Sequence, residues 1–97
     1  MIRVVRMHFK QEHIEDFKQL FESRKELIRN FEGCTYLELW QDEADASIFY
    51  TYSIWKQSSD LECYRMSDLF QVTWSCVKKW FHDSPKAFSA NKLIQLP

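Results

Sequence analysis

The hydrophobic pattern of this chain switches between two periods, and the order of the switches constrains the fold more than any other feature. Segments of period two predict strands, and segments with helical spacing predict helices. The predicted strands are Ile2–Phe9, Cys34–Gln41, Ser47–Trp55 and Ala87–Leu96, and the predicted helices are Glu12–Phe31, Ser58–Arg65 and Ser67–Phe81. This order predicts an α+β fold of the ferredoxin-like βαββαβ plan, with an antiparallel four-stranded sheet and its helices on one face.

Short signals between these segments support the same reading. The only glycine, Gly33, follows the first predicted helix, where a left-handed residue commonly ends a helix. The polar residues 42–46 separate two predicted strands and indicate a hairpin. Either Ser58 or Ser59 is a candidate N-cap of the short helix that follows the third strand.

One face of the predicted sheet has no helix to cover it. Strand alternation assigns Arg6, His8, Tyr36, Glu38 and Trp40 to this face, which is therefore mixed and aromatic. The chain has sixteen aromatic rings in 97 residues, more than a small core readily buries. We expect some of them at a subunit interface, giving a homodimer through the sheet face, or around a cavity. The alternative is a ring-rich monomer core.

Composition excludes several classes of function. The length predicts one domain, residues 1–97, and the net charge of −1 gives no electrostatic case for nucleic acid. No apolar run is long enough for a membrane span, and the N-terminus is too charged for a signal peptide. Three cysteines without CxxC spacing favour reduced thiols, so we expect a cytoplasmic protein.

The usual catalytic motifs are missing from the sequence. With one glycine the chain has no phosphate-cradling loop, and no serine lies in a GxSxG elbow. His8, His13 and His82 are far apart in the sequence and have no metal-ligand spacing, so we expect neither a metal nor a cofactor. The remaining kind of site is an apolar, aromatic pocket with a few polar groups.

The segment from Phe49 to Phe70 joins an aromatic strand to a broken helix and carries the pattern Trp55-x8-Tyr64-x2-Ser67-x2-Phe70. Together with the βαββαβ order, this pattern resembles the antibiotic biosynthesis monooxygenase family over roughly Met1 to Leu93. Members of that family are small ferredoxin-like proteins that pair their sheets into a dimeric α+β barrel. They include cofactor-free quinol and polyketide monooxygenases, haem-degrading enzymes and proteins with no known activity.

The resemblance implies roles for individual residues. Trp55 matches the tryptophan that closes the third strand, and Ser67 to Phe70 matches the Ser-x-x-Phe signature at the start of the next helix. Tyr64 falls where many members carry a histidine and the haem degraders a catalytic tryptophan. Trp74 replaces the haem degraders' axial histidine, and Val5 lies near their strand-one asparagine. Val5, Tyr64 and Trp74 thus all differ from the residues that the haem-degrading members carry at these positions, and this argues against haem degradation.

The family mechanism needs a dry aromatic slot, a proton acceptor and a donor to a developing oxyanion. Tyr64 and His8 are the catalytic candidates, since His8 is the only side chain on a predicted strand that titrates near neutral pH. The candidate pocket residues are Trp55, Trp74, Tyr50, Tyr52, Met7 and Phe70. Two alternatives remain for the space between Tyr64, Trp74 and Trp55: a void of ligand size, roughly 300 Å³ or more, or a pocket filled by the protein's own rings.

Each candidate also has a structural interpretation. Trp74 has helical spacing with Phe70 and is typical of a core residue. Tyr50 and Tyr52 fit ordinary strand positions, and His8 fits an inert, hydrogen-bonded site. The leading functional hypothesis is a cofactor-independent monooxygenase acting on a small quinol, phenol or polyketide-like molecule. A non-catalytic ligand-binding or interaction dimer on the same scaffold is the alternative, and a haem-degrading monooxygenase is a weaker one.

Overall fold

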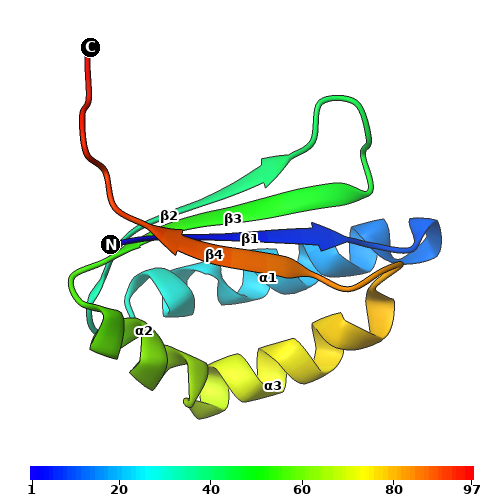
Figure 1. Cartoon of the computed structure of the whole chain (residues 1–97). Helices are drawn as coiled ribbons and strands as arrows, with labels where there is room; N and C mark the ends of the chain where they lie inside the picture. The colour runs from blue at the N-terminus through cyan, green and yellow to red at the C-terminus, as the bar shows by residue number, and fades with distance from the viewer.

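The computed structural model describes all 97 residues and contains one sheet with helices packed on one side of it (Figure 1). The strands are β1 (Ile2–His8), β2 (Cys34–Gln41), β3 (Ile48–Trp55) and β4 (Lys86–Ala90). The helices are α1 (Ile14–Arg29), α2 (Ser58–Arg65) and α3 (Asp68–Val77), with 3-10 turns η1 (Gln11–His13) and η2 (Lys78–Trp80). All strands pair antiparallel in the order β2-β3-β1-β4, which confirms the α+β ferredoxin-like prediction.

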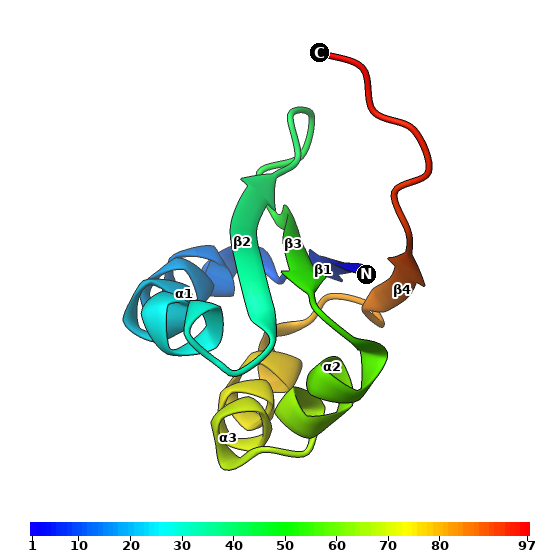
Figure 2. The same ribbon diagram turned by 90° about the vertical axis from the view of Figure 1, so that its left-hand side faces the viewer.

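The helices share one face of the sheet, as Figure 2 shows by looking along it from the side. The opposite face carries no helix in either view. None of the helices combines the length and the apolar character that crossing a bilayer requires.

The last strand is shorter than the sequence suggested. It ends at Ala90, and the chain beyond it extends away from the body of the molecule (Figure 1). The register explains this difference, because Ala90 pairs with Ile2 at the very start of β1. Residues after Ala90 run past the beginning of their only neighbouring strand and find no backbone partner there. The prediction of a strand to Leu96 is therefore wrong at its end.

The helix predicted to reach Phe81 ends at Val77 and continues only as the 3-10 turn η2. Phe81 instead forms an isolated antiparallel bridge with Phe9, where it stacks on the Phe9 ring at 5.3 Å. The predicted serine cap of α2 is also wrong. The N-cap is Gln57, and no side chain caps this helix.

Antiparallel register divides the sheet residues between two faces. Directly paired residues share a face, so Val4, Tyr52 and Glu38 lie on one side and Arg3, Ser53 and Leu37 lie on the other. The side without helices, here called the outer face, consists of Ile2, Val4, Arg6, His8, Tyr36, Glu38, Trp40, Ile48, Tyr50, Tyr52, Ile54, Lys86, Phe88 and Ala90. The predicted placement of Arg6, His8, Tyr36, Glu38 and Trp40 is confirmed.

The core between the sheet and the helices has two separate parts. One cluster contains Met7, Phe9, Phe17, Phe49 and Val77, with the Phe9 and Phe17 rings stacked at 4.3 Å. The other contains Cys34, Trp55 and Leu61. Trp55 is almost fully buried, and its indole Nε1 donates a hydrogen bond to Ser53 Oγ at 2.9 Å. This bond satisfies the polar atom of the indole and fixes the ring.

Gly33 ends the α1–β2 connection with a φ of +89°, the only positive φ in the chain. We expect Gly33→Ala to lower the free energy of unfolding by about 2–4 kcal/mol, because a Cβ there is strained and would also overlap Asp60 Cβ. Urea unfolding measures this loss. Asp60→Ala alone should be well tolerated, and it should not rescue Gly33→Ala since the Asp60 Cβ remains. Near wild-type stability of Gly33→Ala would contradict the backbone argument.

Candidate functional site

A cavity of about 270 Å³ lies between the inner face of the sheet and the helices. The cavity lies between the two core clusters and is lined by residues of both. Met7, Phe17 and Val77 belong to the first cluster, and Trp55 and Leu61 belong to the second. Thirteen of its nineteen lining residues are hydrophobic. The remaining six are Arg3, Thr51, Ser53, Arg65, Thr73 and Pro85, with Tyr64 among the aromatic ones. The cavity is thus the aromatic, mostly apolar kind of site that the sequence favoured.

The helix break positions the aromatic wall of this cavity. The Ser67 hydroxyl donates to the Tyr64 carbonyl oxygen at 2.6 Å and accepts from the Phe70 backbone N–H at 3.2 Å. It therefore ends α2 and caps α3 with one group. The chain turns at this point, so that Tyr64 before the break and Phe70 after it both line the cavity.

Four rings form a continuous series along the wall. Centroid distances are 5.2 Å for Trp55–Tyr64, 5.3 Å for Tyr64–Phe70 and 5.5 Å for Phe70–Trp74, and the last pair is stacked at 13°. Met7 reaches the cavity from β1. The structure thus brings together five of the predicted site residues: Trp55, Tyr64, Phe70, Trp74 and Met7.

Tyr64 is positioned as a hydrogen-bond donor. Burial, followed by the influence of Cys34, raises the pKa of Tyr64 to about 12, so its phenol stays protonated at neutral pH. Its hydroxyl has no partner within the protein, yet no buried side-chain polar atom is left unsatisfied, so this hydroxyl reaches accessible space. Tyr64 is one of the residues that line the cavity.

Two arginines also line the cavity, and the sequence pattern had not marked either of them as a site residue. Burial and the nearby Arg65 charge lower the pKa of Arg3, and Glu62 opposes this shift. Arg3 donates to Ser89 Oγ at 3.1 Å, and Arg65 Nη1 lies 3.6 Å from Glu62 Oε2. The positive charges of Arg3 and Arg65 outnumber the single negative charge of Glu62, so the electrostatic potential at the cavity favours an anion. The alternation of Arg3 with Val5 and Met7 was the available signal for its inward position.

Tyr50 and Tyr52 are not part of this cavity, so their prediction as pocket residues is wrong. Both belong to the outer face, where Tyr52 stacks on Trp40 at 5.1 Å and the Tyr50 hydroxyl donates to Asp42 Oδ1 at 3.1 Å. The reason is parity along β3. Tyr50 and Tyr52 lie five and three positions before Trp55, and residues at an odd offset along a strand point to opposite faces, so Thr51 and Ser53 take the inward positions instead.

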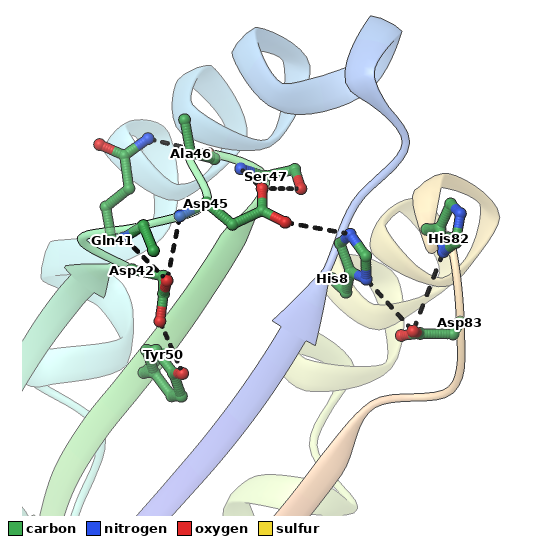
Figure 3. Close-up of polar contacts among 10 residues, drawn as sticks. His8, Gln41, Asp42, Asp45, Ala46, Ser47, Tyr50, His82 and Asp83 are labelled. Atoms are coloured by element: carbon green, nitrogen blue, oxygen red, sulfur yellow. Dashed lines mark hydrogen bonds and ion pairs between the residues drawn. The ribbon is translucent and has the colours of Figure 1, made fainter.

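His8 also lies away from the cavity, at the end of β1 on the outer face (Figure 3). Its Nδ1 is 3.2 Å from Asp83 Oδ2, and its ring centroid is 4.5 Å from that of His82. The hydrogen bond with His8 is the main reason that the pKa of Asp83 lies below its ordinary value. His8 is therefore not placed to accept a proton in the cavity. The expectation that the histidines stand apart is wrong for His8 and His82.

Comparison with known proteins gives a consistent family and fold. The family model for antibiotic biosynthesis monooxygenase matches residues 1–73. None of the curated proteins matches the sequence. Similar solved structures include a conserved protein from Methanosarcina mazei Go1, with 24% identity and a TM-score of 0.84 over 90% of this chain and 87% of that one.

Two further structures are similar over nearly the whole chain. One is an antibiotic biosynthesis monooxygenase with 17% identity and a TM-score of 0.88, covering 97% of this chain and all of that one. The other is a protein from Pseudomonas aeruginosa with 18% identity and a TM-score of 0.85, covering 96% and 93% respectively. At these identities the likeness shows the fold.

The raised pKa of Tyr64 predicts a pH dependence of stability. Folding favours the neutral phenol of Tyr64. The contribution of Tyr64 to the free energy of unfolding is therefore complete below the unfolded-state pKa near 10, and it is lost as pH rises toward the folded-state pKa of about 12. Over this range the wild type should lose on the order of 2 kcal/mol more than Tyr64→Phe. Urea unfolding at a series of alkaline pH values measures the difference. Tyr52→Phe, on the outer face, is the control and should follow the wild type. Equal pH slopes for wild type and Tyr64→Phe would show that Tyr64 ionises freely.

Proposed function

The chain belongs to the antibiotic biosynthesis monooxygenase family, and from this premise we propose that it is a cofactor-independent monooxygenase acting on a small, electron-rich aromatic molecule. Quinols, phenols and polyketide-like hydroxyarenes are the substrate class. The observation that carries the proposal is a mostly apolar cavity with an aromatic wall, two guanidinium groups and a free phenol. The proposed monooxygenase domain spans residues 1–97.

The dimensions of the cavity suit one or two fused rings. Its volume of about 270 Å³ lies just below the usual range of ligand pockets, roughly 300 to 1,000 Å³, so only a small ligand fits. A flat substrate can stack on the rings of Trp55, Tyr64, Phe70 and Trp74, as aromatic pairs prefer. The apolar lining also limits the water near the reacting carbon.

The proposed reaction draws its electrons from the substrate. The substrate anion passes one electron to O2, and the two radicals recombine to form a carbon–oxygen bond. The resulting hydroperoxide loses water, so one oxygen atom stays on carbon as a carbonyl and the other leaves with two hydrogens from the substrate. One O2 is consumed for each substrate molecule.

The residues of the cavity favour the substrate anion with which the proposed reaction begins. Arg3 and Arg65 lower the energy of a substrate phenolate, and the protonated Tyr64 can donate a hydrogen bond to its oxygen. No carboxylate or imidazole lines the cavity, so the substrate is proposed to lose its proton to bulk water as it binds. The substrate must therefore carry a hydroxyl group that is acidic enough to ionise beside two cations.

The same lack of a lining base favours a second candidate function. A protein that binds an aromatic anion without transforming it needs the arginines and the ring wall but no proton acceptor. This non-catalytic ligand-binding dimer predicts binding of quinols or phenols without uptake of O2. The two functions thus separate in a single assay.

We further propose that two copies pair through the outer face to form a dimeric α+β barrel. Tyr36, Trp40 and Phe88 are large apolar residues that are 40–58% exposed on this face. Glu38 at its centre is already engaged, because it accepts hydrogen bonds from the Tyr36 hydroxyl and from Trp40 Nε1. An aromatic patch with a satisfied carboxylate is a suitable centre for a homodimer interface. The three unpaired thiols support a reducing, cytoplasmic location.

For the oxygenase proposal, we expect purified protein to consume O2 with menadiol or a related quinol faster than the quinol autoxidises. Arg3→Met and Tyr64→Phe should each lower kcat/KM by about tenfold or more, because each removes a group that stabilises the anion. An O2 electrode measures uptake, and isotopically labelled O2 followed by mass spectrometry shows whether one atom enters the product.

Two controls keep this result specific. Tyr50→Phe, on the outer face, should retain wild-type activity. Addition of catalase should release no O2 if the oxygen has entered the substrate. If O2 is only reduced to hydrogen peroxide, catalase would release half of the O2 that was consumed. Quenching of tryptophan fluorescence by the same molecules, without uptake above autoxidation, would support the ligand-binding function instead.

The dimer proposal predicts a mass near twice 11.8 kDa by light scattering at micromolar concentration. Trp40→Glu should shift the protein toward the monomer, because it places a second carboxylate beside Glu38 in the apolar patch. Lys56→Glu, off the sheet faces, is a charge-changing control that should stay dimeric. A wild-type mass near 11.8 kDa would refute the dimer.

A further inference from the structure

Two histidines and two aspartates from three segments of the chain meet at one end of the sheet, and we propose that they form a site for a divalent transition-metal ion such as Zn²⁺ (Figure 3). We call His8, His82, Asp83 and Asp45 the histidine cluster. It lies on the outer side of β1, away from the cavity, and the proposal does not depend on the oxygenase function.

Three of these residues have the donor atoms and spacing of metal ligands. His8, His82 and Asp83 each offer one atom, and these atoms all lie within 4.8 Å of one another. His8 Nδ1 is 3.2 Å and His82 Nδ1 is 3.8 Å from Asp83 Oδ2. With bonds of about 2.0–2.2 Å, ligand atoms of a tetrahedral zinc ion lie roughly 3.3–3.6 Å apart. Small side-chain rotations are enough to reach that geometry.

Asp45 is placed to orient one of the ligands. His8 Nε2 points toward Asp45 Oδ2 at 3.9 Å, on the side of the ring away from Asp83 (Figure 3). Asp45 is itself held by Ser47, whose hydroxyl and backbone N–H donate to Asp45 Oδ1 at 2.6 and 2.9 Å. Metal-bound histidines commonly donate their second N–H to a carboxylate in this way. Asp45 can thus hold the His8 ring with Nδ1 directed at the ion.

The backbone already holds the three segments together. The His82 N–H donates to the His8 carbonyl oxygen at 2.8 Å, and the Phe9 N–H donates to the Ser47 carbonyl oxygen at 2.9 Å. The ligands therefore need no large rearrangement to converge. His82 and Asp83 are exposed, so an ion has access, and water can complete its coordination.

A divalent ion accounts for the convergence of two imidazoles on one carboxylate. Both imidazoles converge on the same oxygen, Asp83 Oδ2. If both carried charge, two cations would stand with ring centroids only 4.5 Å apart, which is unfavourable. A divalent ion uses both rings in their neutral form together with the carboxylate. The local pair of His13 and Asp16, at 2.9 Å, shows the simpler arrangement of one ring and one carboxylate.

The test uses tag-free full-length protein with Zn²⁺ and with Co²⁺ as a spectroscopic probe. We expect one ion per chain, visible d–d absorption of bound Co²⁺, and a rise in Tm on the order of 10 °C at a hundredfold excess of Zn²⁺ over Kd. His82→Asn and Asp83→Asn should each weaken binding by more than about 100-fold, and Asp45→Asn by about 10- to 100-fold. His82 and Asp83 are exposed, so neither variant should disturb folding.

Two variants serve as matched controls. His13→Asn removes a histidine outside the cluster and should bind like the wild type, and so should Cys63→Ser, which removes the exposed thiol. No Tm change with Zn²⁺, binding that survives in both His82→Asn and Asp83→Asn, or loss of binding in Cys63→Ser would each overturn the site. Unchanged affinity in Asp45→Asn would remove Asp45 from it.

Discussion

The strict alternation of side chains along β1 and β3 governs nearly everything else in this structure. Antiparallel pairing places residues with matching parity on the same side, so a single register assigns each aromatic ring either to the cavity or to the outer face. Trp55 is inside and Tyr52 is outside for this reason alone. The cavity, the aromatic outer face and the position of His8 all follow from it.

The cavity also requires a second element, the junction between α2 and α3. Strands supply its floor, with Arg3 and Met7 among the contributors, whereas the helices supply Tyr64, Phe70 and Trp74. A continuous helix would progress in one direction and carry these rings along a straight line. The bend at Ser67 instead lets both helices present rings to the same space, and Trp55 joins their series from the sheet.

The fold was accessible from the sequence because its signals are local: period, a single glycine and a polar hairpin segment. The site was only partly accessible. Tyr64, Phe70 and Trp55 belong to a short pattern, but placing Tyr50 and Tyr52 needed a parity argument counted from Trp55. The approach of His82 to His8 depends on how the chain after α3 returns to the end of β1. Sequence distance carries no information about such a contact between residues so far apart.

The Ser67 hydroxyl gives the short Ser-x-x-Phe signature a specific meaning. Its serine contacts only the backbone, through the Tyr64 carbonyl oxygen and the Phe70 N–H, and it touches no reacting group. The signature therefore encodes a corner in the chain. In another sequence the signature should therefore predict where two helices meet. It should not predict the reaction of that protein, which depends on the side chains beside the junction.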